Sequence, residues 1–597
     1  MKKTLTAVIS ILLIAVFLAS AVLAVNLELN IKIRRKLSTM IRPFEIVATA
    51  PKQILLTETG PIIDEQSKEL MSIYETQGKV FLNVVHLNFD GVSSHYDQKN
   101  KVLSIIAGEE HLTVTESGVS TLNGEKIDIN VALINLGEAI YISLDDLNRL
   151  SIGDKIGFSQ VNASQGGNVI IMNAYWPISE VTLNDGTWIF ETHDALLERQ
   201  KNDYEIDFLY RIGNLFNKTR ILDESKRISV VAYDLGDDTL FIVDQSNTAG
   251  YVAKTDNMVL NTRPPEKTQL PNARHLSFSD PIVMTWEAVY SYNPDPKVLP
   301  EMPYVNVVSP TWYELADSSG GITGKPSDDY IAWATGKSFH LWPLVSNAFD
   351  IDRTHDFLHD FFARKQFIEK LIEEAVLKGY EGINIDFENV YLADRDALTH
   401  FVNEFVYYAH QKNLMVSMDV TVMGGSDNWS KCYDHPRLGK IVDFLVIMAY
   451  DEYWASSPVS GPVASYDWVE KHMTALAEVV DSRKLVLGIP LYTRVWREYP
   501  AEDVANKERV KSTAIGMEAQ NTLIEKYALK PIWDEVDRLF YATFFENDAQ
   551  VKIWIENAVT IKEKAKLVDT LNLKGVATWR RGFETPDIWP VFKLLFD

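Results

Sequence analysis

The second half of the chain alternates between predicted helices and predicted strands, and this rhythm restricts the folds that it can adopt. Residues 364–378 carry apolar side chains at helical spacing, Gly379 marks the end of that helix, and an apolar strand follows directly. Such an alternation is typical of a (β/α)8 barrel or of a doubly wound parallel sheet. Eight parallel strands are predicted, at residues 282–286, 304–309, 339–345, 382–387, 415–420, 442–449, 485–490 and 575–579. Eight strands over this length predict an α/β fold, the (β/α)8 or TIM barrel, in which active sites lie at the C-terminal ends of the strands.

The predicted strand at residues 382–387 combines apolar and acidic side chains. Because successive side chains of a strand point to opposite faces, the segment has two different faces. One face carries Ile383, Ile385 and Phe387, and the other carries Asn384, Asp386 and Glu388. Burying polar side chains costs free energy unless they are paired, so acids at the end of a barrel strand indicate chemistry. Pairs of acids are the working groups of glycoside hydrolysis. A strand end with solvated acids is the alternative that this segment alone leaves open.

Four segments together resemble the motifs of glycoside hydrolase family 18. Residues 381–388 (EGINIDFE) resemble the family signature D-G-x-D-x-D-x-E, with Glu381 and Asn384 in place of two acids. Residues 448–451 (MAYD) resemble its M-x-Y-D motif. Residues 488–492 and 575–580 resemble the ends of its seventh and eighth strands. Residues 460–465 and 579–584 are most similar to bacterial spore-germination and cell-wall members, of the N-acetylglucosaminidase type.

The resemblance implies a substrate-assisted, retaining mechanism. Glu388 is expected to protonate the glycosidic oxygen, while the 2-acetamido group of the sugar attacks the anomeric carbon. Asp386 is expected to hold the acetamido N–H and stabilise the resulting intermediate, and as an anion it would oppose proton loss from Glu388. The implied catalytic residues are Glu388, Asp386 and Tyr450, and the implied substrate-binding residues are Asp451, Trp579, Tyr492, Asn384 and Met448.

Several of these residues also have plainer interpretations. Tyr450 and Trp579 could be packed barrel aromatics rather than sugar contacts. Asp419 could support the other acids or simply close its strand, and Arg494 could anchor substrate or be a surface charge. Because Asn384 replaces a family acid, it can orient Asp386 but cannot share a proton with it, which leaves the recycling of the acid open.

The interval between the last two predicted barrel strands is long. Residues 531–536, 539–545 and 551–556 alternate between apolar and polar side chains in the manner of antiparallel strands. We therefore expect a small α+β insertion after the seventh strand, forming one wall of the groove.

The N-terminus begins with Lys2 and Lys3 followed by an uncharged, mostly apolar run that ends at Val25. Residues 1–25 are thus expected to be a signal peptide or a membrane anchor, and the rest of the chain is expected outside the cytoplasm, secreted or membrane-anchored. A single cysteine, Cys432, excludes an intrachain disulfide.

The region before the barrel is predicted to consist of β-rich modules. Residues 26–215 weakly resemble the stalk module at the start of some copper amine oxidases, without implying a copper site. Residues 216–262 resemble a small bacterial Src-homology-3-like barrel, and residues 263–280 read as a linker to the domain at 281–597. The barrel segment is expected to fold without these modules.

The net charge and the motifs reduce the number of possible functions and partners. The net charge of −24 argues against nucleic acid as a partner and suits an uncharged amino-sugar polysaccharide. We predict no cofactor and no metal site. The predicted function is cleavage of β-1,4 bonds beside N-acetylglucosamine, in peptidoglycan or spore cortex. The alternatives are a chitinase and a lectin-like barrel that binds glycan without cleaving it.

Overall fold

The computed structural model describes residues 79–156 apart from 90, 137 and 138, and residues 278–596 apart from 501–508, together with Leu276; elsewhere between 54 and 262 it describes strand backbones only. The chain divides into two compact units, residues 83–155 with 270–597 and residues 1–82 with 156–269. In the described part of the chain no helix is both long and apolar enough to cross a lipid bilayer. The predicted signal peptide or anchor at residues 1–25 lies outside that part.

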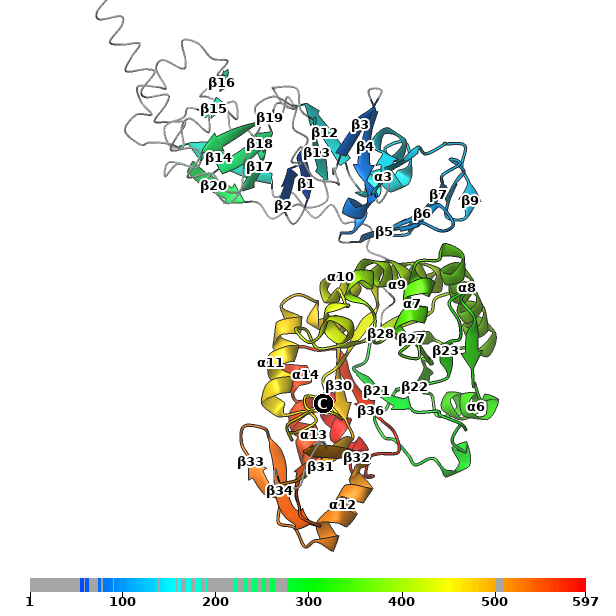
Figure 1. Ribbon diagram of the computed structural model, residues 1–597, viewed down its shortest axis with the longest axis vertical. Coiled ribbons are helices and arrows are strands. Elements are labelled where there is room, and N and C mark those ends of the chain that lie inside the picture. The colour runs from blue at the N-terminus through cyan, green and yellow to red at the C-terminus, as the bar shows by residue number, and fades with distance from the viewer. Residues whose placement is uncertain are drawn as a thin grey trace, which may run out of the picture. The chain divides into compact units, whose positions relative to one another are not determined.

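The eight predicted strands form a parallel barrel, which confirms the predicted fold class (Figure 1). They are β21 (Ile282–Glu287), β22 (Val307–Pro310), the pair β25 (His340–Leu341) and β26 (Leu344–Ser346), β27 (Gly382–Asp386), β28 (Met415–Thr421), β29 (Phe444–Met448), β30 (Leu485–Pro490) and β36 (Gly575–Trp579). Neighbouring strands run in the order β26-β27-β28-β29-β30-β36-β21-β22-β25. For most of the strands, the predicted boundaries differ from the observed ones by a few residues.

The third barrel strand is split in two, and this split closes the barrel. β25 pairs with β22, and β26 pairs with β27. Pro343 lies between the two halves, where it has no N–H to offer a neighbouring strand. Its carbonyl still accepts a hydrogen bond from the amide of Asn384, so the two halves hold the strands on either side together.

Helices cover the outside of the barrel. They are α6 (Asp328–Gly336), α7 (Ile351–Leu358), α8 (Phe361–Lys378), α9 (Arg395–His410), α10 (His435–Ile441), α11 (Tyr466–Ala477), α13 (Ala558–Ala565) and α14 (Leu567–Thr570). The predicted end of α8 is confirmed, because Gly379 adopts the left-handed conformation at φ 73° and its N–H bonds back to the helix. At the other end Asp360 caps the helix by accepting from the amides of Phe362 and Ala363.

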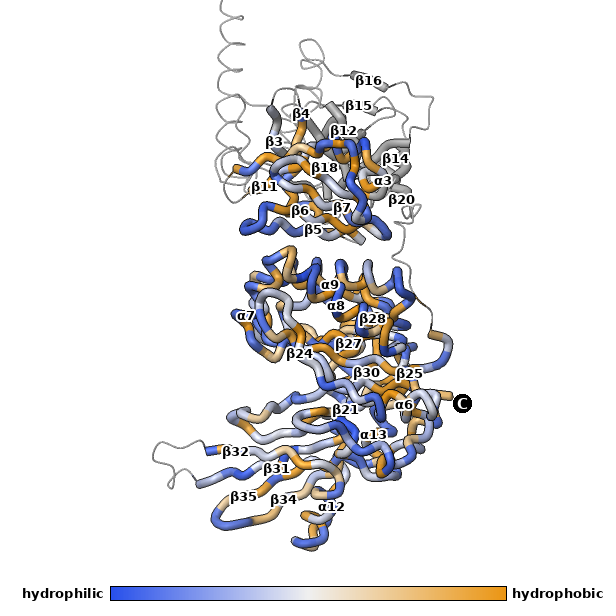
Figure 2. Tube along the Cα trace, turned by 90° about the vertical axis from the view of Figure 1, so that its right-hand side faces the viewer, coloured by the Kyte–Doolittle hydropathy of each residue, from blue (hydrophilic) through white to orange (hydrophobic). Residues whose placement is uncertain are grey.

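The core has one layer inside the barrel and one between strands and helices. The inner layer includes Met284, Trp342 and Val446. In the outer layer the apolar face of β27 meets the helices, and the ring of Phe387 stacks on Phe401 of α9 with 5.2 Å between centroids. Figure 2 shows hydrophobic residues in β27. The opposite face of β27 therefore points into the barrel, as the alternation predicts.

The expected insertion after the seventh strand is present. β31 (Tyr492–Glu498), β32 (Val510–Gly516), α12 (Met517–Lys526), β33 (Ile532–Asp534), β34 (Leu539–Glu546) and β35 (Ala549–Ile555) form it. Its antiparallel sheet has the order β32-β31-β35-β34-β33. Because β31 begins two residues after β30 ends, its first side chains remain beside the C-terminal end of the barrel.

Residues 83–155 belong to the same compact unit as the barrel. An antiparallel sheet of β5 (Val92–Asp97), β6 (Val102–Ala107), β7 (Glu110–Thr115), β8 (Ser120–Leu122) and β9 (Glu125–Lys126) contacts α9. β10 (Leu133–Leu136), β11 (Ala139–Ser143), α2 (Leu144–Leu147) and α3 (Ser151–Ile156) follow. This grouping differs from the predicted division, which placed residues 83–155 inside a separate module at 26–215.

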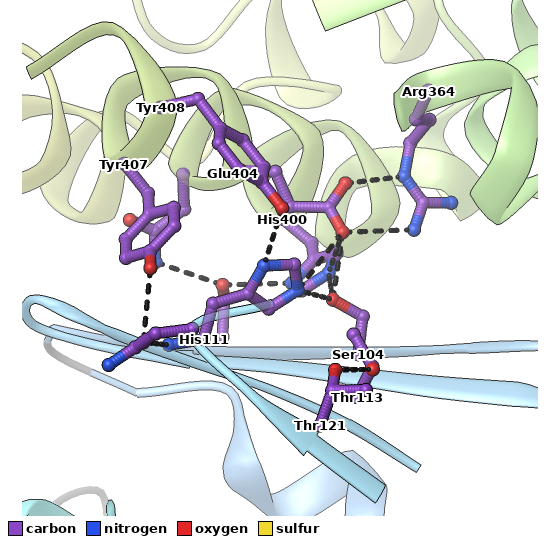
Figure 3. Close-up of polar contacts among 12 residues, drawn as sticks. Ser104, His111, Thr113, Thr121, Arg364, His400, Glu404, Tyr407 and Tyr408 are labelled. Atoms are coloured by element: carbon purple, nitrogen blue, oxygen red, sulfur yellow. Dashed lines mark hydrogen bonds and ion pairs between the residues drawn. The ribbon is translucent and has the colours of Figure 1, made fainter. Parts of the chain in front are cut away.

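A buried polar network joins this sheet to the helices (Figure 3). Glu404 of α9 accepts a hydrogen bond from Ser104 of β6 at 2.7 Å and pairs with Arg364 of α8 at 2.7 Å. His111 of β7 lies 2.9 Å from the Ser104 hydroxyl. The side chains of Arg364 and Glu404 are almost completely buried. Ser104 thus links the sheet to Glu404, whereas the pair of Arg364 and Glu404 lies within the helices.

The other unit contains further sheets, which are described as backbone. β12 (Phe158–Asn162), β13 (Asn168–Met172), β1 (Ile54–Thr57) and β2 (Gly60–Ile63) form one sheet. A second has the order β19 (Ala249–Ala253), β18 (Thr239–Val243), β17 (Ser229–Asp234), β14 (Ile178–Leu183) and β20 (Met258–Thr262). This sheet takes in β14, which lies outside the predicted module at 216–262. The modules at 26–215 and 216–262 and the linker at 263–280 otherwise stay predictions.

Candidate active site

The polar face of β27 forms a layered set of hydrogen bonds inside the barrel. Asn384 is fully buried; its Nδ2 donates to Asp419 Oδ2 of β28 at 2.6 Å. Its Oδ1 accepts from the hydroxyl of Ser417 at 2.6 Å. Asn384 therefore fixes the side chain of Asp419. Sequence reasoning gave it a different role, that of orienting Asp386.

Asp386 lies one layer above Asn384. Its Oδ1 is buried without a hydrogen-bond partner in the described part of the chain, and so is Oδ1 of Asp419. Burial raises the pKa of Asp386 to about 7. The strand pairing aligns Ile385 with Met418, so Asp386 and Asp419 follow side by side on neighbouring strands whose backbones are about 5 Å apart. The carboxyl groups of Asp386 and Asp419 thus lie close together in the low-dielectric interior of the barrel.

Glu388 follows β27 at the mouth of the barrel. Burial, then Asp386 and Asp451, raise its pKa well above the ordinary value of a glutamate. Asp386 thus opposes proton loss from Glu388, as expected. The backbone is fixed by Asn347, whose Oδ1 accepts from the Glu388 N–H at 3.0 Å and whose Nδ2 donates to its carbonyl at 2.7 Å.

Two tyrosines surround this acid group. Tyr450 lies just after β29; burial, then Asp419, raise the pKa of its hydroxyl well above the ordinary value. Tyr433, which sequence reasoning missed, is buried and donates a hydrogen bond to the carbonyl of Phe387 at 2.9 Å. Tyr450 thus keeps its proton and can donate a hydrogen bond beside the acids, while Tyr433 fixes the backbone between Asp386 and Glu388.

Asp451 connects the barrel to the insertion. It has a left-handed backbone at φ 57°. Its Oδ1 accepts from the hydroxyl of Tyr492 at 2.6 Å and from Nη2 of Arg494 at 2.8 Å, and both residues lie on β31. Arg494, left open by the sequence, is thus a buried partner of Asp451 rather than a surface charge. The insertion contributes directly to the site through these two residues.

The other predicted site residues lie at different levels of the barrel. Trp579 ends β36, is half-buried, and its ring contacts Trp286 at 5.7 Å between centroids. Met448 ends β29 and is almost buried. Glu381 precedes β27 at the opposite end from Glu388, where its Oε2 accepts from the amide of Leu341 at 3.0 Å. The replacement of a family acid at Glu381 is therefore remote from the chemistry.

Two exposed aromatic residues flank Glu388. Phe349 and Trp429 are 52% and 43% exposed, with 6.1 Å between ring centroids. Asn389, directly after Glu388, donates to the Phe349 carbonyl at 2.9 Å. Sequence reasoning missed Phe349 and Asn347, which lie in a loop without periodicity, and Trp429, which lies in the short π-helix η5 (Asp427–Lys431). Ala348 and Phe349 have positive φ values, which are common at functional sites but cannot be predicted from a sequence pattern.

Comparison with known proteins identifies the domain. Residues 352–584 match the family model described as glycosyl hydrolases family 18. An uncharacterized glycosylase, YvbX, of Bacillus subtilis is 26% identical over 302 residues, which are 49% of this chain and 84% of that protein. The cortical fragment-lytic enzyme of the same organism is 26% identical over 291 residues, 46% of this chain and 64% of that protein.

Among solved structures, a chitinase from Chromobacterium violaceum is 26% identical and covers 53% of this chain and 99% of its own, with a TM-score of 0.46. The chain thus spans less than two thirds of the cortical fragment-lytic enzyme but most of the other two proteins. The segment that forms most of the barrel belongs to glycosyl hydrolase family 18, and the protein carries a glycosidase domain.

Proposed function

We propose that this protein cleaves β-1,4 bonds beside N-acetylglucosamine in peptidoglycan by a substrate-assisted, retaining mechanism. The observation that supports it most is the raised pKa of Glu388 directly above Asp386 on one strand face. A carboxyl with a raised pKa keeps its proton to higher pH and can act as general acid on the glycosidic oxygen. The similarity to a cortical fragment-lytic enzyme favours peptidoglycan of the spore cortex as the substrate.

In the proposed mechanism each step is assigned to a residue. Glu388 donates its proton to the leaving oxygen while the acetamido oxygen attacks the anomeric carbon, so no protein nucleophile is needed. Asp386 accepts the acetamido N–H and, as it ionises, stabilises the positive charge on the ring that forms. Tyr450 donates its hydroxyl hydrogen toward the same acetamido group. Water then opens the ring as the Glu388 carboxylate removes its proton, which restores the acid.

Asp419 is the proposed proton partner of Asp386. The family signature has an acid where this chain has Asn384, and here the acid stands on the neighbouring strand, held by the Asn384 amide at 2.6 Å. Burial and Asp386 raise the pKa of Asp419 well above its ordinary value. Two coupled carboxyls can share one proton as Asp386 gains charge.

An exchange of acid and amide tests this role. Asp419→Asn is expected to lower kcat about 10-fold, since general acid–base groups contribute ~10²–10⁴-fold and this one acts through another carboxyl. The double variant Asn384→Asp/Asp419→Asn returns the acid to β27 and is expected to recover much of that loss. If Asp419→Asn, which keeps the shape, leaves kcat unchanged, Asp419 has only a structural role.

Product analysis tests the reaction and its substrate. The full-length protein is incubated with purified cortex peptidoglycan, with chitin oligosaccharides and with an unsubstituted glucan, and products are identified by mass spectrometry and their anomeric form by NMR. We expect N-acetylglucosamine reducing ends of retained configuration from peptidoglycan. Preferred cleavage of chitin would support the chitinase alternative. Cleavage of the glucan, which has no acetamido nucleophile, would contradict the mechanism, and binding without any product would support the lectin-like alternative.

We also propose that the protein acts outside the cytoplasm, either secreted or held by its N-terminal segment. The proposed polymer lies there, and the apolar run up to Val25 after Lys2 and Lys3 is typical of an export signal or an anchor. Cell fractionation with detection of the N-terminus distinguishes cleavage from anchoring.

A further inference from the structure

Two histidines and a buried aspartate gather on the outer face of the barrel. His355 lies in α7, and His359 caps its end; the amide of His359 bonds to the carbonyl of His355, so the two rings occupy successive turns. Asp394 ends the short helix η4 (Leu392–Asp394) and precedes α9. Its carboxylate lies 2.8 Å from Nδ1 of His355 and 2.9 Å from Nε2 of His359. One atom from each residue lies within 4.8 Å of the other two.

The exposure of these groups suits an ion that arrives from solvent. The side chain of Asp394 is 2% exposed, whereas those of His355 and His359 are 47% and 40% exposed. The carboxylate is therefore buried, and the two imidazoles are reachable from solvent. Sequence reasoning predicted no metal site and overlooked the H-x-x-x-H spacing of the histidines. Asp394, 35 residues from His359 along the chain, joins them only through the fold.

We propose that His355, His359 and Asp394 form a binding site for a divalent transition metal of the zinc class. Imidazole nitrogens with one carboxylate oxygen are a ligand set that zinc accepts, with water in the fourth position. Ligand atoms around a tetrahedral zinc stand roughly 3.4 Å apart, so the imidazoles need to withdraw from the carboxylate by about half an ångström. Half-exposed rings at the end of a helix have room for that movement.

The surroundings favour a cation over a bare hydrogen-bonded cluster. The exposed Asp352 and Asp356 flank His355 in sequence, and the net charge of the chain is −24. The ring of His95 packs on His359, with 4.9 Å between centroids, and covers one side of it. The nearby acids attract a divalent ion.

The site lies on the path from α7 to Glu388. Thr354, directly before His355, accepts a hydrogen bond from Nδ2 of Asn347, which also holds the Glu388 backbone. On the other side, Asp394 ends the segment that follows Glu388. A metal ion would therefore tie α7 to the far end of that segment. By holding both ends of this path, the ion would help to position Glu388. That effect on Glu388 rests on the proposed function, whereas metal binding itself does not.

Zinc binding by the full-length, tag-free protein tests the proposal. After chelator treatment, ZnCl₂ is titrated calorimetrically in the presence of a weak competing chelator, and thermal unfolding is followed with and without zinc. We expect one tight site per chain and a zinc-dependent rise in Tm. His359→Ala and His355→Ala are each expected to weaken binding at least 10-fold and to abolish the rise in Tm.

The control variant is His472→Ala, which removes a histidine from α11 that stacks on Trp468 instead. It should bind zinc as the wild type does. Asp394→Asn keeps an acceptor for both histidines but removes the charge, and is expected to weaken zinc binding as well. Unchanged stoichiometry and affinity in His355→Ala/His359→Ala, or no tight site in the wild type, would overturn the proposal. Because the readout is binding and not turnover, an inactive protein that binds zinc would leave this site established.

Discussion

Glu388 illustrates how the fold sets the protonation state of a single side chain. Its acidity is lowered by burial and by two neighbouring acids, Asp386 and Asp451. Glu388→Gln preserves the shape but has no proton to give. We expect kcat to fall by ~10²–10⁴-fold, the usual contribution of a general acid, while glycan binding stays nearly intact. Turnover and binding are measured separately on soluble oligosaccharides, and full activity in this variant would contradict the assignment.

Asp386 also makes folding stability depend on pH. The pKa of an unfolded aspartate is 3.8, and the folded value is about 7. Between these values the folded protein holds a proton that the unfolded chain has lost, so this residue's contribution to stability falls as pH rises from about 4 to 7. The full effect is on the order of 4 kcal/mol, from 1.36 kcal/mol per pKa unit.

The matching variant is Asp386→Asn, which cannot ionise. Its stability relative to wild type is expected to increase as pH rises from 4 to 8, measured by urea unfolding at several pH values. Asp329→Asn, at an exposed position of α6, is the control and should show little of this trend. A difference between Asp386→Asn and wild type that does not vary with pH would contradict the raised pKa.

At the scale of elements, the loop between β26 and α7 positions the end of β27. Asn347 is fully buried and makes hydrogen bonds to the N–H and carbonyl of Glu388 and to Thr354. Two residues of the loop, Ala348 and Phe349, have left-handed backbones at φ 55° and 58°. Such conformations persist only where surrounding contacts enforce them, which is common at functional sites.

Removal of this contact should affect turnover more than binding. Asn347→Ala leaves the buried Glu388 N–H without a partner, at a cost of ~1–3 kcal/mol in stability. We expect kcat to fall about 10-fold with KM changed less, because the acid is displaced from the glycosidic oxygen. Asn347→Asp, which keeps the acceptor for the N–H, should retain more activity. Equal kcat in Asn347→Ala and wild type would show that β27 positions Glu388 alone.

At the scale of the molecule, residues 83–155 are part of the catalytic unit. Burial opposes ionisation of Glu404, but Arg364 and His400 together hold its pKa well below its ordinary value. Burial lowers the pKa of His111 to about 4, so that histidine is neutral in the folded protein. A chain that begins at Pro281 would lack Ser104 and His111 but would keep the pair of Arg364 and Glu404. Independent folding of the barrel segment stays a prediction.

Glu404→Gln tests the stabilisation by this buried network, in which Glu404 contacts both Arg364 and Ser104. It leaves the Arg364 guanidinium buried without a counter-charge, and loss of one partner of a buried pair typically costs ~3–5 kcal/mol. Glu369→Gln on α8 is the control, because its pairing with Lys365 is half-exposed and contributes at most ~0.5 kcal/mol. Urea unfolding measures both variants. An equal effect of the two would mean that the network does not stabilise the unit.

The sequence by itself determined the barrel, its strand positions, the acid face of β27 and the family, because periodicity and short motifs are local properties. The strand order and the α+β insertion also followed from it. Only the tertiary structure decided which groups meet across long intervals: Asn384 with Asp419, Asp451 with Arg494, His359 with Asp394, and Ser104 with Glu404. Such contacts depend on chain paths through loops that carry no periodic signal. For that reason the assignment of residues 83–155 to the catalytic unit could not be read from the sequence.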